Sequence, residues 1–205
     1  MNYLQDSTQV VNIRGVISTK HPVTSAVIQG SVLGPIFFAI YINDIDDHVK
    51  DCKILKYADD IRIYRCFKSD LISQSENADS FQSDINSIHS WSETWDLNFN
   101  ISKCCVLHFG RPNVRSAYKI KDMLLKSKHQ EKDLGIIFTD KFKFKDHMDA
   151  VINKANRHLG IIARVFKYKN PQTIAPLYKS FVRPLLEHNS IIWSPYTNTY
   201  IHKLE

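Results

Sequence analysis

The sequence predicts an α+β fold, because strand-like and helix-like stretches mix over the first 140 residues and a basic helical stretch follows. Of the 205 residues, 43% are hydrophobic and 23% are charged, which is typical of a globular chain with a real core. The longest apolar run, residues 36–42, is far shorter than the roughly 20 residues of a membrane-spanning helix. Fibrous, disordered and membrane-spanning classes are therefore excluded, and no membrane partner is expected.

The cysteines indicate the compartment. Cys52, Cys66, Cys104 and Cys105 form no paired disulfide framework, which favours a reduced intracellular setting, cytosol or nucleus. The first thirty residues also lack the basic and apolar regions of a signal peptide. Zinc is a weak alternative for the adjacent cysteines with His108, because neighbours on a strand point to opposite faces and no second pair follows.

One helix and three or four strands are predicted in the first third of the chain. Residues 10–27 alternate loosely and indicate one or two strands. A tight loop then leads into residues 32–43, an apolar stretch with Pro35 near its start, where proline is tolerated in a helix. We expect this helix to be buried. Residues 53–57 and 61–64 are short β-rich runs, which predict a hairpin.

The remaining chain is predicted to be helical at both ends of a short strand region. Residues 68–80 are polar and predict a loop, residues 104–109 and 134–138 predict strands, and helices are predicted from Phe144 and after Pro171. The apolar stripe after the loop is formed by Phe81, Ile85, Ile88, Trp91 and Trp95. The faces of the last two helices are formed by Met148, Ile152, Ala155, Leu159, Ile162 and Phe166, and by Ile174, Leu177, Tyr178, Phe181 and Leu185.

Basic charge is concentrated at the C-terminal end. Residues 1–140 hold 16 Lys and Arg against 17 Asp and Glu, whereas residues 141–205 hold 11 against 4. Such an excess attracts an anionic partner such as a nucleic-acid backbone, although basic helices are often only solvated faces. Lys154, Arg157 and Arg164 lie off the apolar helix face, while His147, among basic residues, is expected at the surface.

The predicted hairpin carries two adjacent carboxylates, Asp59 and Asp60, in a turn without glycine. Neighbouring carboxylates at a partly buried turn repel each other, so we expect one to be protonated or a positive group to lie between them. Mg²⁺ takes carboxylate oxygens and leaves positions for water and substrate phosphates. Adjacent aspartates are also common in exposed turns, so the pair alone does not define a metal site.

Blocks along nearly the whole chain resemble one family. The sequence resembles the reverse transcriptases of non-LTR, LINE-like and jockey-like retrotransposons in the order and spacing of these blocks. They are Gln29-Gly30-Ser31-Val32-Leu33-Gly34-Pro35, Tyr41-Ile42-Asn43-Asp44, Tyr57-Ala58-Asp59-Asp60, Leu97-Asn98-Phe99-Asn100 with Lys103-Cys104, Glu131-Lys132-Asp133-Leu134-Gly135, Lys154-Ala155-Asn156-Arg157 and Trp193-Ser194-Pro195-Tyr196. The resemblance implies that residues 1–140 form a partial right-hand polymerase palm, ferredoxin-like, and that residues 141–205 form a basic, helical thumb-like module, incomplete at the C-terminus.

The resemblance also implies roles for single residues. Asp59 and Asp60 would bind the Mg²⁺ pair, Tyr57 would lie beside the nucleotide, and Lys103 would protonate the leaving pyrophosphate. Template and deoxynucleoside triphosphate would be contacted by Gln29, Gly30 and Ser31, and the backbone of an RNA template and DNA primer by Lys154, Arg157 and Arg164.

Departures from the family pattern suggest a fragment that is inactive alone. Ala26-Val27-Ile28 stands where Gly-Val-Pro is usual, and Ile61-Arg62 replaces a small threonine after the aspartates. The third metal-binding aspartate of the family belongs to an earlier palm strand that is not in this sequence, so we expect no unaided turnover. Two alternatives stay open: a non-catalytic nucleic-acid-binding remnant, or a translation product without function.

Overall fold

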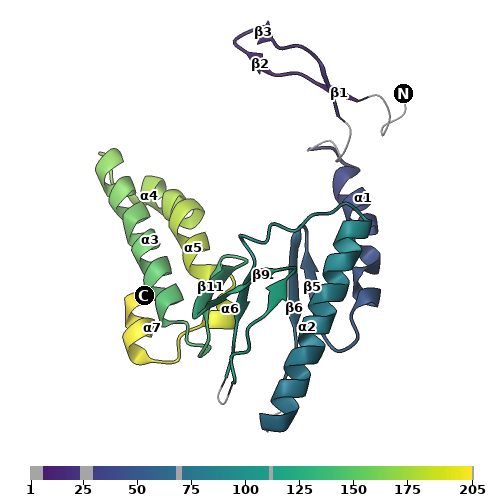
Figure 1. Cartoon of the computed structure of the whole chain (residues 1–205). Helices are drawn as coiled ribbons and strands as arrows, with labels where there is room; N and C mark the ends of the chain where they lie inside the picture. The colour runs from purple at the N-terminus through teal and green to yellow at the C-terminus, as the bar shows by residue number, and fades with distance from the viewer. Residues whose placement is uncertain (1–6, 24–29, 68–70, 111–112, 205) are drawn as a thin grey trace. The chain divides into compact units, whose positions relative to one another are not determined.

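The computed structural model describes residues 7–23, 30–67, 71–110 and 113–204, and it confirms a mixed α+β chain (Figure 1). Its contacts divide the chain into two compact units, Met1–Phe99 and Asn100–Glu205. No helix in the described ranges combines the length and the apolar character needed to cross a bilayer. The four cysteines are free thiols.

The N-terminal strands pair in two short antiparallel ladders. β1 (Thr8–Gln9) pairs with β4 (His21–Pro22), and β2 (Asn12–Ile13) pairs with β3 (Val16–Ile17). Both residues of the turn between β2 and β3 have positive φ, as the right-handed twist of a two-residue hairpin favours. Strand structure is thus confirmed over residues 10–27 as far as residue 22, although as three two-residue strands and not as the one or two that were predicted. Residues 24–27 lie outside the described ranges.

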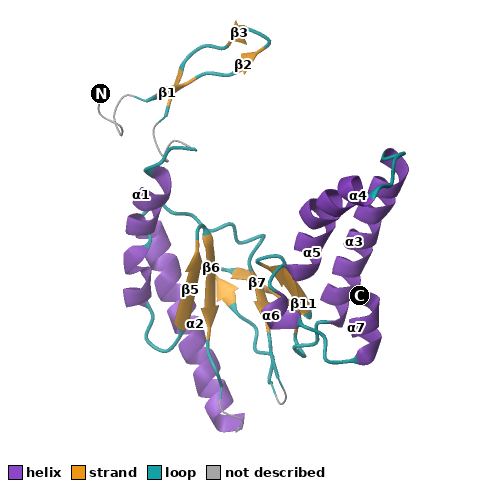
Figure 2. Ribbon diagram, turned by 180° about the vertical axis from the view of Figure 1, so that it is seen from behind, coloured by secondary structure: helices purple, strands orange, loops and turns teal. Residues whose placement is uncertain are grey.

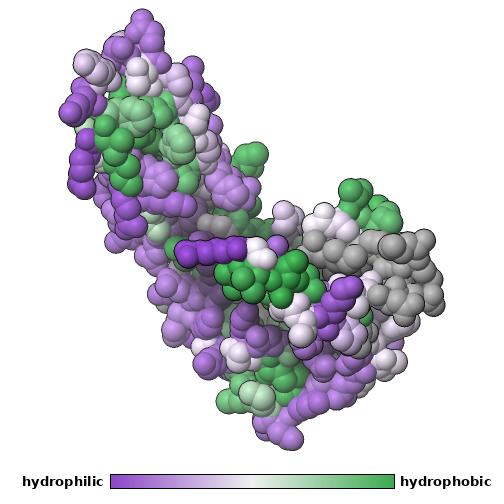
Figure 3. Space-filling view, turned by 90° about the horizontal axis from the view of Figure 1, so that it is seen from above, coloured by the Kyte–Doolittle hydropathy of each residue, from purple (hydrophilic) through white to green (hydrophobic). Residues whose placement is uncertain are grey.

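The predicted helix after the loop is confirmed as α1 (Gly34–Tyr41), followed by a 3-10 turn, η1 (Asn43–His48). The expected burial of this helix is wrong. Gly34 is the buried residue of α1, whereas Ile36 and Ile40 are 53% and 67% exposed. Phe38 packs against the core, so one side of α1 is covered, whereas its other apolar side reaches the surface. Figure 3 shows apolar side chains among polar ones on one face of the molecule.

The predicted hairpin is confirmed as β5 (Lys53–Tyr57) and β6 (Asp60–Tyr64), and it is followed by α2 (Leu71–Thr94). The predicted loop is wrong from residue 71 onward, and residues 68–70 are not described. The first ten residues of α2 contain neither glycine nor proline. Ser, Asn and Asp have only modest helix propensity, which argues weakly against a helix here. Packing of the following turns of α2 overrides this preference.

The core of the first unit lies between α2 and the hairpin, which run side by side in Figures 1 and 2. Its fully buried residues are Ile42, Ile45, Ile88 and Trp91. Trp91 also donates its indole N–H to Asp44 at 3.1 Å, which satisfies the one polar group of the ring. The predicted stripe is confirmed at Ile85, Ile88 and Trp91, but Trp95 follows the end of the helix and stays 43% exposed.

The strands of the second unit form three two-stranded ladders. β7 (Cys105–Leu107) pairs with β10 (Lys126–Lys128) in parallel, whereas β8 (Lys119–Ile120) pairs with β9 (Met123–Leu124), and β11 (Gln130–Asp133) with β12 (Ile136–Thr139), antiparallel. The strands predicted at residues 104–109 and 134–138 are confirmed as β7 and β12. A methyl group added at Gly135, which has φ +89°, would lie 2.8 Å from the His188 ring.

The helices of the second unit are α3 (Lys145–Val165), α4 (Pro171–Leu177), η2 (Tyr178–Val182), α5 (Arg183–Glu187), α6 (Ser190–Trp193) and α7 (Asn198–Leu204). On α3 the predicted face is buried at Met148, Ala155 and Ile162. The face predicted after Pro171 is wrong at Tyr178 and Phe181, which are exposed. η2 is a π-helical turn that adds one residue, so the buried positions move from Tyr178 and Phe181 to Val182.

Two further expectations concern this unit. His147 is buried, not at the surface, and its ring meets Trp193 edge to face with centroids 5.1 Å apart. The strands β7 to β12 share a compact unit with the helices that follow them. This division by contacts does not test where a palm would end and a thumb begin. The predicted boundary at residue 140 therefore stays a prediction.

Candidate active site

The hairpin of β5 and β6 presents two different faces. Ile54, Ile61 and Ile63 pack against the core of the first unit. Because successive residues of a strand point to opposite sides, the alternate positions point outward. In register, these outward pairs are Lys53 with Tyr64, Leu55 with Arg62, and Tyr57 with Asp60. The inner face therefore fixes which side chains the outer face offers to a ligand.

The turn at the end of this hairpin is strained. Tyr57 and Asp60 are the last paired residues, so Ala58 and Asp59 form a two-residue turn. Ala58 has φ +50°, a conformation that costs a residue with a Cβ about 1 kcal/mol or more and that glycine adopts freely. Strain of this kind persists where the surroundings enforce it and is common at functional sites.

Asp59 and Asp60 lie side by side at this turn, and both are exposed. The expected partial burial of the turn is therefore wrong. The Arg62 guanidinium lies 3.5 Å from an Asp60 carboxylate oxygen, so a positive group lies beside one of the two carboxylates. A positive group between the two stays a prediction. Tyr57, the cross-strand partner of Asp60, is 63% exposed.

The loop before α1 holds the next predicted residues. Gln29 lies outside the described residues. Gly30 has φ +81° and faces open space where a Cβ would stand, so its backbone is accessible. The Ser31 hydroxyl accepts a hydrogen bond from the Gly34 N–H at 3.0 Å, which supports the first turn of α1.

Lys56 ties the hairpin to the far end of α1. Its ammonium donates to the carbonyls of Ile42 and Asn43 at 3.4 and 3.3 Å and to the Asp46 carboxylate at 2.7 Å. The positive charge of a lysine at the carboxyl end of a helix is attracted to the partial negative charge there. Asp46 is half exposed, and its pair with Lys56 anchors the strand that leads into the turn.

Asp84 of α2 holds the start of β5, and sequence reasoning missed it. Its buried carboxylate accepts the backbone N–H groups of Lys50, Asp51 and Cys52 at 3.0, 3.0 and 2.9 Å. Burial raises the pKa of Asp84, but the Lys50 amide, the Cys52 thiol and the other two amides outweigh it, and the pKa lies below its usual value. Burial, with Asp84 beside the thiol, raises the pKa of Cys52 to about 12.

The other predicted residues belong to the second unit. Lys103 is exposed and lies in a turn, where its backbone N–H donates to the Asn100 carbonyl at 3.0 Å. Lys154, Arg157 and Arg164 are exposed on α3. Arg157 and Arg164 are two turns apart and share one helix face, away from the buried side. The roles predicted for these four cations stay predictions.

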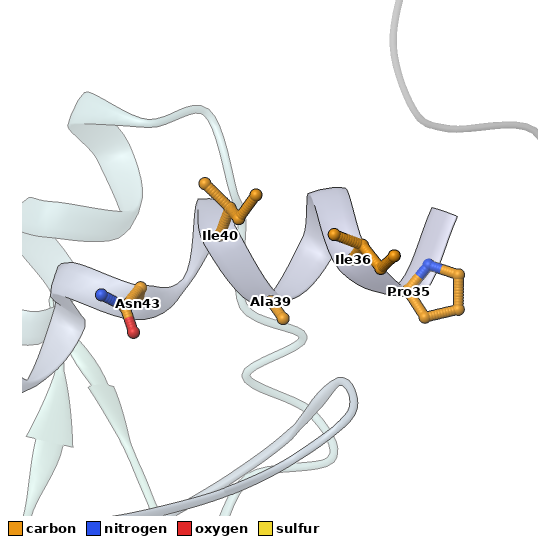
Figure 4. Close-up of a pocket in the computed structure, with 5 residues that line it drawn as sticks. All are labelled: Pro35, Ile36, Ala39, Ile40 and Asn43. Carbon is orange, nitrogen blue, oxygen red and sulfur yellow. The ribbon is translucent and has the colours of Figure 1, made fainter. Parts of the chain in front are cut away.

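A separate pocket lies on α1 and opens to solvent (Figure 4). None of its lining residues was predicted as part of the site; they are Pro35, Ile36, Ala39, Ile40 and Asn43. Most of these side chains are apolar, so the pocket offers few groups for the chemistry of a triphosphate.

The turn offers ligands of the right chemical type for Mg²⁺. Two carboxylates are hard oxygen ligands, and Mg²⁺ is commonly held by one or two of them together with substrate phosphates. Among the residues that the structure describes, no group of three or more His, Cys, Asp or Glu side chains could hold a metal ion. The two carboxylates of Asp59 and Asp60 have the ligand chemistry that Mg²⁺ prefers, and their role as metal ligands stays a prediction.

A hairpin with paired aspartates, backed by two helices in an α+β unit, agrees with the family whose model matches residues 2–161. That family is described as reverse transcriptase (RNA-dependent DNA polymerase), and the chain belongs to it. No solved structure matches the chain.

The particular relatives are polymerases of mobile elements. The chain is 23% identical, over 99% of its length, to the RNA-directed DNA polymerase from mobile element jockey of Drosophila melanogaster. It is 24% identical, over 94% of its length, to the probable RNA-directed DNA polymerase from transposon BS of the same species. It covers 23% and 22% of these two relatives, less than a quarter of each.

Proposed function

We propose that this chain is the segment of a retrotransposon reverse transcriptase that carries two carboxylates of a two-metal nucleotidyl-transfer site. The observation that carries the proposal is the strained turn that presents Asp59 and Asp60 together at the end of a hairpin whose first strand is held at both ends. The relatives named as RNA-directed DNA polymerases support RNA as template and DNA as product.

In this proposal Asp59 and Asp60 hold Mg²⁺ at the turn. The bound ions would supply the positive charge that activates a primer 3′-hydroxyl and neutralises the triphosphate. The protein's own contribution is orientation: Lys56 and Asp84 fix the two ends of β5, so the carboxylates keep their position when an anionic substrate approaches. Tyr57 lies on the same outward face and would flank the nucleotide.

The remaining residues supply binding and a proton. The open backbone at Gly30, with Gln29 and Ser31, would contact the template and the incoming deoxynucleotide. Lys103 is exposed and would donate a proton to the leaving pyrophosphate. Phosphates of primer and template would meet the basic face of α3, formed by Lys154, Arg157 and Arg164.

We infer that the chain does not extend a primer by itself. Among the residues that the structure describes, no third metal-ligating side chain joins the two carboxylates. Residues that act as one catalytic unit lose far more than a proportional share of rate when one is missing. A non-catalytic nucleic-acid-binding role is the second candidate, favoured by the 11 basic against 4 acidic residues at positions 141–205.

Binding and extension, measured on the same samples, test the proposal. Fluorescence anisotropy with an RNA template annealed to a labelled DNA primer should show affinity that falls steeply with salt. Neutralising Lys154, Arg157 and Arg164 to glutamine should lower the slope of log affinity against log salt by about 2 to 3. An unchanged slope would contradict the role of the α3 face.

Primer extension with Mg²⁺ and deoxynucleotides should be undetectable with this chain. Extension that disappears in Asp59→Asn would show that the turn is catalytic and would refute the inferred inactivity. Extension that persists in Asp59→Asn and in Asp60→Asn would refute the site itself.

A further inference from the structure

The outward face of the hairpin places a cation beside one of the proposed metal ligands. Asp60 and Arg62 are two residues apart on β6, so their side chains leave the strand on the same side. The inward positions between and after them, Ile61 and Ile63, are held in the core. An Arg62 guanidinium nitrogen accordingly lies 3.5 Å from an Asp60 carboxylate oxygen.

Packing restricts Arg62 more than Asp60. The side chain of Arg62 is 27% exposed, whereas that of Asp60 is 63% exposed. Leu55 is the cross-strand partner of Arg62, so the arginine stem stands beside an apolar side chain while its head reaches the carboxylate. The cation is therefore held near Asp60, and the carboxylate keeps an open side toward solvent.

The neighbouring lysines are placed less well to compensate the turn. Lys56 points to the opposite face, where it pairs with Asp46 at 2.7 Å. Lys53 shares the outward face but stands four residues before the turn, about 14 Å along the strand. That separation exceeds the Debye length of about 8 Å at physiological ionic strength.

We propose that Arg62 is a resident competitor for the metal at Asp60, pairing with the carboxylate in the metal-free chain and lowering the affinity of the turn for divalent cations. This inference rests on the proposed function, because it takes the turn to be the metal site. A metal ion on the open side of the carboxylate would stand close to the guanidinium, so repulsion between the two positive charges opposes metal binding. Arg62 thus tunes the affinity of the site without being a ligand.

The size of the effect follows from exposure. Ion pairs between exposed groups are weak, so removing Arg62 should tighten metal binding only about two- to fivefold. Higher monovalent salt should shrink this difference, since it screens the pair that the variant lacks. Arg62→Lys keeps the charge and should stay close to the unaltered chain.

Titration of the full chain with Mn²⁺, followed by the electron paramagnetic resonance of the free ion, tests the proposal. Mn²⁺ prefers the same oxygen ligands as Mg²⁺. Arg62→Gln and Arg62→Met should both lower the dissociation constant, Met preserving the apolar stem. Lys53→Gln removes the same charge from the same face and should leave the constant unchanged. Circular dichroism identifies any variant that fails to fold.

The outcomes separate this inference from the proposed function. Weaker binding in Asp59→Asn and Asp60→Asn, together with tighter binding in both Arg62 variants, supports both. Weaker binding in the aspartate variants with no change in either Arg62 variant overturns the role of Arg62 and leaves the metal site standing. Equal binding in all variants removes the metal site, and the role of Arg62 falls with it.

Discussion

The carboxylate of Asp84 is predicted to hold the hairpin in place, and its removal should loosen the candidate site from a distance. One oxygen accepts the Lys50 amide, and the other accepts the amides of Asp51 and Cys52. Asp84→Asn keeps the size of the side chain but turns one oxygen into an N–H donor. If the new NH₂ group replaces the oxygen that accepts from Asp51 and Cys52, these two backbone N–H groups lose their acceptor.

The magnitude follows from these bonds. A hydrogen bond to a charged group contributes about 1.5–3 kcal/mol, and a buried donor left without a partner costs a similar amount. With relaxation of the loop, the loss should be about 3 kcal/mol, which is a large share of the roughly 5–15 kcal/mol that stabilise a typical domain. The equilibrium constant for local opening of residues 50–57 should therefore rise about 100-fold.

Hydrogen exchange read by mass spectrometry measures this opening directly. Peptides that cover residues 50–57 should exchange faster in Asp84→Asn, while Asp79→Asn, an exposed aspartate on the same helix, should behave like the unaltered chain. Because the folded pKa of Asp84 lies below its usual value, its contribution is present above about pH 4 and is lost as the pH falls through the folded pKa. A change in exchange below about threefold at neutral pH would refute the clamp.

Three further predictions concern Cys52, His147 and Gly135. Burial raises the pKa of Cys52 to about 12, so this thiol should resist iodoacetamide at pH 8 in the folded chain while exposed Cys66 reacts. Equal rates of reaction would contradict this. Burial, with His188 and Lys132 nearby, lowers the pKa of His147, so the melting temperature should fall as the pH drops below about 6.5, and less so in His147→Gln. Gly135→Ala should lower the melting temperature by about 4 °C or more, whereas Gly160→Ala should not lower it.

Local pattern was enough to predict the elements that build the site. Short β-rich runs on both sides of Asp59 predicted the hairpin, because β-branched and aromatic residues favour strands. The spacing of Ile88 and Trp91 predicted the helix beneath it. Both signals lie within a few residues of chain, so no knowledge of distant contacts was needed.

The supporting contacts could not be predicted in the same way. Asp84 acts on amides more than thirty residues away, and a lone polar residue on an amphipathic helix gives no sign of such a partner. The π turn from Tyr178 to Val182 shifts a buried face by one residue without a distinctive sequence. Arg62 was noted as a departure from the family, but its pairing with Asp60 depends on strand geometry.

The central claim is that the turn at Asp59 and Asp60 binds divalent metal ions for polymerase chemistry. Fe²⁺ with ascorbate and peroxide cleaves a backbone beside its binding site. Fe²⁺ generally binds a given site somewhat more tightly than Mn²⁺ does. Cleavage of this chain should fall between Tyr57 and Arg62, should be suppressed by excess Mg²⁺, and should be lost in Asp59→Asn. Cleavage elsewhere, or at the turn irrespective of that substitution, would contradict the account.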